Sequence, residues 1–246
     1  MVARRLARHL AGWLRREVEA GGGKGAVLGL SGGLDSAVAG ALAKRAFPDE
    51  TLGVLMPCHS DPSDAEDAML VARYFDLETA TVDLSTVHDA LVAALEASSP
   101  RLGDHRLTTA NLKPRLRMTT LYAHANLRGY RVIGAENLDE LTIGYFTKYG
   151  DGGADFFLLG SLNKGEVRDL ARELDVPRRI IDKPPSAGLW PGQTDEGEMG
   201  LTYEHLDAFV RGREVPAKVR ARIEALRDAG AHKRAMPRIA PLPDEA

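Results

Sequence analysis

The chain has 246 residues, of which 44% are hydrophobic and 27% are charged, which is typical of a globular domain and excludes a disordered or fibrous protein. Its net charge of −3 argues against nucleic acid as a partner, because binding a phosphate backbone usually requires a clear basic excess. A single cysteine, Cys58, excludes a disulfide within the chain and a paired-cysteine metal site, and favours a reducing cytoplasm.

Neither a signal peptide nor a membrane association is expected. Basic residues interrupt the apolar runs near the N-terminus, and no stretch approaches the roughly 20 apolar residues needed to cross a bilayer. The pattern over residues 3–20 instead predicts an amphipathic helix, which the glycines at 21–23 end.

Predicted strands and helices alternate through the first half of the chain. Strands are expected at 26–30, 51–56, 79–82 and 130–134, and helices at 35–46, 62–75, 86–97 and 108–128. The first strand is apolar throughout, as expected of a strand covered on both faces. The alternation predicts an α/β fold with a doubly wound parallel sheet flanked by helices. In such sheets, ligands bind beyond the carboxyl ends of the strands.

The second half of the chain is less regular. Residues 147–163, rich in glycine and aspartate, predict a loop, and residues 183–192 carry too much proline and glycine for regular structure. Helices are expected at 164–174, 202–211 and 215–229. Loops as long as 147–163 and 183–200 are unusual in a compact domain unless they are functional. With neither a repeat nor a linker, residues 1–246 are expected to form a single domain.

The strongest local signal directly follows the first predicted strand and reads Gly29-Leu30-Ser31-Gly32-Gly33-Leu34-Asp35-Ser36. Adjacent glycines allow a sharp turn, and the free backbone N–H groups of the helix that follows favour a phosphate. Ser31 and Ser36 can add hydroxyl donors, and Asp35 can hold a metal ion. The motif lacks the lysine of a GxxxxGK[ST] P-loop and is not the GxGxxG dinucleotide fingerprint.

Ser31 to Ser36 resemble the PP-loop of the adenine-nucleotide α-hydrolase-like ATP pyrophosphatases, which split ATP between its α- and β-phosphates. Within that superfamily, residues 134–140, 144–155 and 184–196 resemble the signatures of the NAD synthetase family. Residues 111–118 and 232–234 match that family as well. The resemblance extends in order from about residue 10 to residue 240 and implies a Rossmann-like PP-loop fold.

The resemblance also implies roles for individual residues. The ATP-binding residues would be Gly29, Leu30, Ser31, Gly32, Gly33, Leu34, Asp35, Ser36, Ala135, Lys164 and Ser186. Those that bind deamido-NAD would be Arg115, Lys148, Asp155, His232 and Lys233. Asp35 and Glu140 would hold Mg²⁺, and Asp35, Lys164 and Asp155 would serve catalysis. Ala135 departs from the threonine of many members, which removes a hydrogen bond worth about 0.5–1.5 kcal/mol.

Several of these roles agree with elementary chemistry. A lysine such as Lys164 can stabilise the charge that develops on leaving pyrophosphate. Two carboxylates such as Asp35 and Glu140, with substrate phosphates, form a usual Mg²⁺ site. Arg115 and Arg117 are two positions apart on a helix and face different directions, so at most one should contact a ligand, and the resemblance favours Arg115. Cys58 is interpreted as a small packing residue.

The implied reaction is the ATP-dependent amidation of deamido-NAD, the last step of NAD biosynthesis. The carboxylate would attack the α-phosphorus of ATP and release pyrophosphate, and ammonia would then displace AMP from the acyl-adenylate. Ammonia is expected as the nitrogen source because the chain has no room for the amidohydrolase domain of glutamine-dependent relatives. The resemblance also implies a homodimer.

Two alternatives remain open at this stage. A tRNA-thiolating PP-loop enzyme is disfavoured by the acidic charge balance and the lack of paired cysteines. A nucleotide sensor that binds ATP without turnover is disfavoured by the joint presence of Asp35, Glu140 and Lys164, although these residues alone do not prove turnover.

Overall fold

A parallel sheet of five strands organises the computed structural model, which describes residues 2–102, 104–190 and 192–242. The strands are β1 (Ala26–Gly29), β2 (Thr51–Leu55), β3 (Glu78–Thr81), β4 (Arg131–Gly134) and β5 (Phe156–Phe157). They lie in the order β3-β2-β1-β4-β5, with every neighbouring pair parallel. The chain builds one side of the sheet outward from β1 and then crosses back to build the other. Ligands bind at such a switch point, here between β1 and β4.

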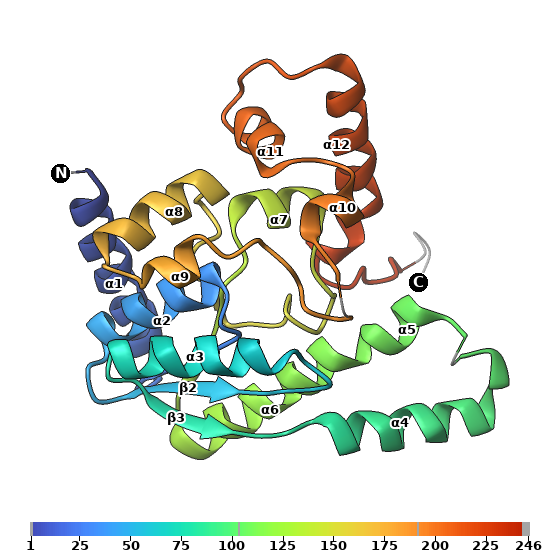
Figure 1. Cartoon of the computed structure of the whole chain (residues 1–246), viewed down its shortest axis with the longest axis horizontal. Coiled ribbons are helices and arrows are strands. Elements are labelled where there is room, and N and C mark those ends of the chain that lie inside the picture. The colour runs from blue at the N-terminus through green and yellow to red at the C-terminus, as the bar shows by residue number, and fades with distance from the viewer. Residues whose placement is uncertain (1, 103, 191, 243–246) are drawn as a thin grey trace.

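Helices cover both faces of this sheet, which confirms the predicted doubly wound architecture (Figure 1). One face carries α1 (Val2–Ala20), α2 (Leu34–Ala46), α3 (Pro62–Tyr74) and α8 (Lys164–Glu173), and the other carries α6 (Leu112–Arg128). Side chains alternate between the two layers along β1 and β4. Leu28 and Ile133 belong to the first core, and Val27 and Val132 to the second. A strand buried in this way needs apolar residues at successive positions.

The remaining helices lie at the ends and margins of the sheet. They are α4 (Ser85–Ser98), α5 (Arg106–Ala110), α7 (Leu138–Ile143), α9 (Arg178–Ile181), α10 (Asp195–Met199), α11 (Tyr203–Val210) and α12 (Ala217–Ala229). Two 3₁₀ turns span Pro100–Leu102 and Ala231–Lys233. None of the helices within the described ranges is long and apolar enough to cross a membrane.

A third, smaller core joins the later helices. Helices α7, α10, α11 and α12 and the short segment after α10 all contribute to it. Its buried residues are Ile143, Met199, Leu201, Tyr203, Leu206 and Ile223. This core holds α11 against α7, and both helices carry polar side chains of the site described below.

The structure corrects three sequence predictions. The helix expected over 108–128 is two helices that meet at Asn111, because Pro114 has no N–H with which to continue the hydrogen bonds of α5. The expected loop over 147–163 contains the short strand β5, which pairs with β4 at Ile133 and Gly134. The irregular stretch expected over 183–200 ends in α10, which Thr194 caps by accepting a hydrogen bond from the N–H of Gly197. Pro191 of that stretch lies outside the described residues.

Helix α7 was absent from the sequence prediction. Asn137 begins it with a capping box, in which its side chain accepts hydrogen bonds from the N–H groups of Asp139 and Glu140. The Glu140 side chain reciprocates by accepting from the N–H of Asn137. The Asn-x-x-Glu spacing is the signal that could have located this helix. The cap fixes the position of Glu140 at the carboxyl end of β4.

Gly32 is the residue of the β1–α2 turn that tolerates no side chain. Its φ is +75°, and a Cβ placed there would lie 2.4 Å from the backbone oxygen of Asp64 and 2.8 Å from Cβ of Asp67. Gly22 has a similar φ of +71°, but a Cβ at that position would meet nothing within 4 Å. Comparing substitutions at these two glycines therefore separates the cost of backbone strain from the cost of steric clash.

Gly32→Ala is expected to destabilise the protein more than Gly22→Ala. The left-handed backbone alone costs a Cβ-bearing residue about 1–2 kcal/mol, and Gly32→Ala must in addition displace α3. Urea unfolding monitored by circular dichroism measures both free energies of unfolding. Equal losses for the two variants would contradict the close packing of the turn against α3.

Candidate active site

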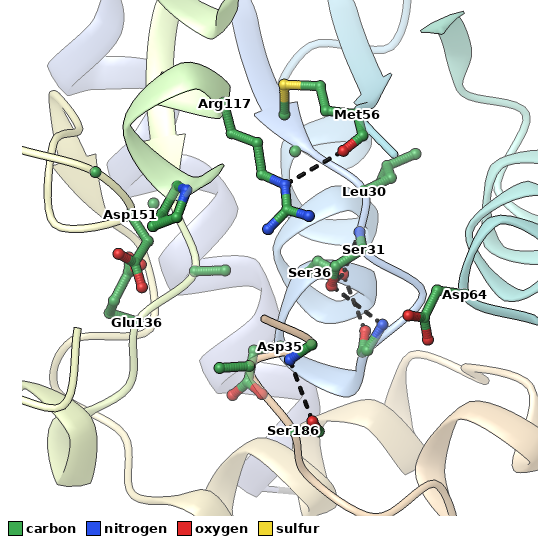
Figure 2. Close-up of a pocket in the computed structure, with 18 of the residues that line it drawn as sticks. Leu30, Ser31, Asp35, Ser36, Met56, Asp64, Arg117, Glu136, Asp151 and Ser186 are labelled. Atoms are coloured by element: carbon green, nitrogen blue, oxygen red, sulfur yellow. Dashed lines mark hydrogen bonds between the residues drawn. The ribbon is translucent and has the colours of Figure 1, made fainter. Parts of the chain in front are cut away.

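The turn after β1 is built to receive an anion. The N-terminal turn of α2 has no side-chain cap, so its backbone N–H groups are free to bind a phosphate. The turn is ordered by its own serines. Ser36 Oγ donates to the carbonyl oxygen of Gly33 at 3.0 Å, and the N–H of Gly33 donates to Ser31 Oγ at 3.2 Å. The two hydroxyl oxygens lie 3.0 Å apart (Figure 2).

A cavity of about 370 Å³ lies at the carboxyl ends of β1, β2 and β4, directly beside this turn. Almost all the predicted ATP-binding residues line it, namely Gly29, Leu30, Ser31, Gly33, Leu34, Asp35, Ser36, Ala135, Lys164 and Ser186. Glu140, predicted to bind metal, lines it too. Gly32 is absent from the lining and packs against α3 instead.

Lys164 lies at the centre of the polar cluster in this cavity. Its side chain is 3% exposed, and Nζ donates to Asp35 Oδ2 at 2.6 Å and lies 3.5 Å from Glu140 Oε1. Burial alone would lower the pKa of Lys164, but the charges of Asp35 and Glu140 outweigh it and raise the pKa. The lysine is therefore a permanent cation facing the turn after β1.

Tyr203 and Asp195 complete the cluster from the far end of the chain. The Tyr203 hydroxyl lies 3.0 Å from Glu140 Oε1 and 2.9 Å from Asp195 Oδ2, and the Lys164 ammonium sits 4.7 Å from the centre of its ring. Burial and the neighbouring carboxylates raise the pKa of Tyr203, so it remains a proton donor. No local signal in the sequence points to this residue, because only the small core of α7, α11 and α12 brings it to the site.

The cluster carries more negative charge than Lys164 can balance. Burial, reinforced by the charge of Asp35, raises the pKa of Glu140 to about 7, and burial raises the pKa of Asp195. Three carboxyl groups around one lysine present oxygen donors of the type that Mg²⁺ prefers, beside a turn suited to phosphate. The residues present thus fit a divalent cation held by Asp35 and Glu140.

A proline-rich segment closes one side of the cavity. Lys183 donates to Asp64 Oδ1 at 2.8 Å and to Asp67 Oδ2 at 2.6 Å, which ties the segment to α3. Ser186 Oγ donates to the carbonyl oxygen of Gln193 at 2.8 Å and accepts from the N–H of Gly188 at 3.1 Å. These contacts place Ser186 opposite the turn after β1 (Figure 2). The sequence prediction assigned no role to Lys183.

Arg117, Glu136 and Asp151 form the opposite end of the cavity (Figure 2). Arg117 Nε donates to the carbonyl oxygen of Met56 at 3.2 Å, so this arginine faces the cavity and anchors the end of β2. Glu136 is 9% exposed, and its Oε2 is without a hydrogen-bond partner among the described residues. Burial raises the pKa values of both Glu136 and Asp151, which face each other.

The residues predicted to bind deamido-NAD are not gathered in this cavity. Arg115 is exposed, whereas its neighbour Arg117 lines the cavity. Asp155 Oδ2 accepts from the N–H of Val132 at 2.7 Å, and Oδ1 accepts from the Tyr122 hydroxyl at 3.3 Å.

The other three residues of that set lie together beside α7. Lys148 Nζ donates to the carbonyl oxygen of His232. Lys233 Nζ donates to the carbonyl oxygens of Gly144 and Phe146 at 2.8 and 2.7 Å. The C-terminal 3₁₀ turn is thereby folded back onto the segment that follows α7.

A glycine turn between a parallel strand and a helix, with a lysine and two carboxylates facing it, defines a nucleotide-binding α/β protein of the PP-loop class. A family model described as NAD synthase matches residues 6–237. The chain is 46% identical over 230 residues to the NH₃-dependent NAD⁺ synthetase of Carboxydothermus hydrogenoformans, covering 94% of each chain. This chain belongs to the NAD synthase family.

Solved structures agree with this assignment. An NMN synthetase from Francisella tularensis is 37% identical, with a TM-score of 0.91 and 98% of both chains covered. An NH₃-dependent NAD synthetase from Campylobacter jejuni is 28% identical, with a TM-score of 0.81, covering 98% of this chain and all of that one. The Rossmann-like PP-loop fold predicted from sequence is confirmed.

The raised pKa of Glu140 predicts a pH-dependent stability in the absence of Mg²⁺. Folding favours the protonated carboxyl, so its contribution to stability is present below the ordinary pKa of 4.5 and is lost as the pH rises through about 7. Glu140→Gln, which resembles the protonated form, should lose less stability than wild type between about pH 5 and pH 8, with a difference of at most about 2–3 kcal/mol.

Urea unfolding at both pH values, in a buffer with a chelator, measures this difference. Glu96→Gln is the matched control because Glu96 is exposed on α4, away from the cavity. Parallel pH profiles for wild type and Glu140→Gln would show that Glu140 ionises at its ordinary pKa.

Proposed function

We propose that this protein is an amide ligase that converts deamido-NAD into NAD with ATP and ammonia, releasing AMP and pyrophosphate. The observation that carries the proposal is the Lys164 cluster. One buried lysine, two carboxylates and the turn after β1 meet at the switch point of the sheet in a chain of the NAD synthase family. The name of the Carboxydothermus relative, an NH₃-dependent NAD⁺ synthetase, supports both the product and the nitrogen source.

The first step forms an acyl-adenylate. A carboxylate oxygen of deamido-NAD bonds to the α-phosphorus of ATP, the bridging bond to the β-phosphate breaks, and pyrophosphate leaves with the electron pair. The N–H groups of α2 and the hydroxyls of Ser31 and Ser36 hold the phosphates, and Lys164 Nζ stabilises the charge on the leaving group. We propose Mg²⁺, held by Asp35 and Glu140, as the cofactor, which neutralises phosphate charge when it is bound.

The second step forms the amide. The nitrogen of ammonia bonds to the acyl carbon, the bond to the AMP oxygen breaks, and the nitrogen loses a proton. Holding both ligands rigidly contributes through orientation. We keep as predictions that Arg115, Lys148, Asp155, His232 and Lys233 bind deamido-NAD, and that Asp155 assists the incoming ammonia.

A second candidate substrate is nicotinate mononucleotide, whose amidation yields NMN. The observation that favours it is the TM-score of 0.91 to the Francisella NMN synthetase, against 0.81 to the Campylobacter NAD synthetase. Both substrates present the same nicotinate carboxylate, so the first-step chemistry around Lys164 is common to them.

The setting of the enzyme is also a proposal. We infer that it works in the cytoplasm as a single-domain protein, in keeping with Cys58 as the sole cysteine. We further infer a homodimer. Helix α4 supports this, because its apolar residues are only partly covered in the single chain, where His88 is its one buried residue and Val87 is exposed.

An end-point assay tests the proposed reaction. The protein is mixed with ATP, Mg²⁺, ammonium and either deamido-NAD or nicotinate mononucleotide, and the amide product, AMP and pyrophosphate are quantified, with glutamine replacing ammonium in parallel tubes. Equal amounts of NAD, AMP and pyrophosphate with deamido-NAD are expected, with little NAD from glutamine. Faster turnover of the mononucleotide would favour the second candidate. Folded protein that releases no pyrophosphate with either substrate would be a nucleotide sensor.

Lys164→Met is expected to slow pyrophosphate release by about 10²–10³-fold, because the developing charge loses its buried cation. Single-turnover measurement of pyrophosphate reports this step directly. Lys218→Met, on the exposed surface of α12, is the matched control and should leave the rate unchanged. Thermal unfolding checks that both variants are folded. If a folded Lys164→Met variant released pyrophosphate at the wild-type rate, Lys164 would not stabilise the leaving group.

A further inference from the structure

A cluster of metal-ligating side chains lies outside the cavity lining, at the start of α4. His59, His88 and Asp89 each offer one ligating atom, and these three atoms all lie within 4.8 Å of one another. His59 comes from the loop after β2, and His88 and Asp89 come from the first turns of α4. The two imidazole rings approach edge to face, with centroids 5.8 Å apart.

The surroundings of the two ring nitrogens of His88 indicate how this histidine could bind an ion. His88 Nε2 lies 3.2 Å from the carbonyl oxygen of Thr109, and because a carbonyl cannot donate, Nε2 must carry the proton. In the neutral ring, Nδ1 then presents a lone pair to Asp89 Oδ1 at 3.4 Å. Either a proton on Nδ1 or a metal ion can bridge these two groups. Donation of the distal ring N–H to a backbone carbonyl is the arrangement that orients metal-binding histidines.

The geometry suits a four-coordinate ion. Bonds of about 2.0–2.1 Å to a tetrahedral ion place two ligand atoms about 3.3 Å apart. The separation of His88 Nδ1 from Asp89 Oδ1 is 3.4 Å, whereas His59 Nε2 is 2.7 Å from Asp89 Oδ1. His59 would therefore withdraw by less than about 1 Å, and its exposed side chain is free to do so.

The backbone of His59 supports this arrangement. Its φ is 52°, in the left-handed region that costs a residue other than glycine free energy and that is maintained by surrounding contacts. Its N–H donates to Ser85 Oγ at 3.2 Å, at the beginning of α4. These features direct the imidazole ring of His59 toward Asp89 (2.7 Å).

We propose that His59, His88 and Asp89 form a site for a divalent transition-metal ion of the zinc class, separate from the carboxylate site for Mg²⁺ at Asp35 and Glu140. Imidazole nitrogens select such an ion over Mg²⁺, which prefers oxygen ligands. A bound ion would join α4 to the β2–α3 loop, whose Pro57 and Ser60 line the nucleotide cavity. Since Ser60 Oγ also accepts from Arg117, the ion would order one wall of that cavity.

Cobalt binding tests the site independently of the proposed ligase activity. Tag-free protein is titrated with Co²⁺ in excess Mg²⁺, and visible absorption reports four-coordinate cobalt with nitrogen ligands. About one Co²⁺ per chain is expected, displaced by Zn²⁺. His59→Asn and Asp89→Asn, both at exposed side chains, should each weaken binding at least tenfold. His88 is buried, so its replacement is not used.

His9→Asn is the matched control, because His9 is an exposed histidine on α1 and should leave cobalt binding unchanged. Thermal unfolding of the metal-free variants confirms that they are folded. Wild-type protein without the absorption of four-coordinate cobalt would overturn the proposal. So would wild-type affinity in both folded variants, or an equal loss in His9→Asn.

Discussion

The ammonium group of Lys164, buried among carboxylates, is the constraint on which the site depends. Its side chain pairs with Asp35 from α2 and Glu140 from α7, while its backbone N–H donates to Asp139 Oδ2 at 2.8 Å. Removing a charge of this kind from water is costly and is offset only by close partners. The first residue of α8 thus fixes the positions of the two helices that carry the carboxylates.

The same cluster explains why the C-terminal helices belong to the site. The Tyr203 hydroxyl from α11 lies within hydrogen-bond distance of Oε1 of Glu140 and Oδ2 of Asp195, and so links the Asp195 carboxylate of α10 to the cluster. The small core around Leu206 and Ile223 holds these helices against α7. Negative charge still exceeds positive charge in the cluster. This imbalance suits the proposed binding of a divalent cation, because ionised oxygens bind such a cation most tightly.

The proline-rich segment contributes in another way. Lys183 reaches Asp64 and Asp67 on α3, and Gly32 packs its backbone against the same helix. Helix α3 therefore supports the phosphate-binding turn from behind and the Ser186 segment from the side. Movement of α3 would alter both walls of the cavity together. The candidate metal site includes His59 from the loop that leads into α3. A metal ion bound there would therefore order the segment that precedes this supporting helix.

The predictions from sequence succeeded where the signal is local. Apolar strands between helical patterns predict the parallel sheet, because burial on both faces demands them, and the structure confirms it. Phosphate binding by the turn at residues 29–36 follows from the free backbone N–H groups at the start of a helix and stays a prediction. All the residues predicted to bind ATP except Gly32 line one cavity, and those of the turn after β1 and Ala135 do so because the ends of parallel strands share an edge. The predictions were wrong where pairing between distant strands decides the structure. Strand β5 is an example, because its two phenylalanines become a strand only by pairing with β4.

What the sequence by itself determined is the fold class, the glycine turn after the first strand, the family signatures, and the type of chemistry that a lysine and two carboxylates can perform. Only the tertiary structure decided which groups surround Lys164, that Arg117 and not Arg115 faces the cavity, and that His59 meets His88 and Asp89. These outcomes depend on contacts between residues distant in the chain. Periodicity and local motifs record what a segment does with its immediate neighbours and carry no information about which distant segment will pack against it.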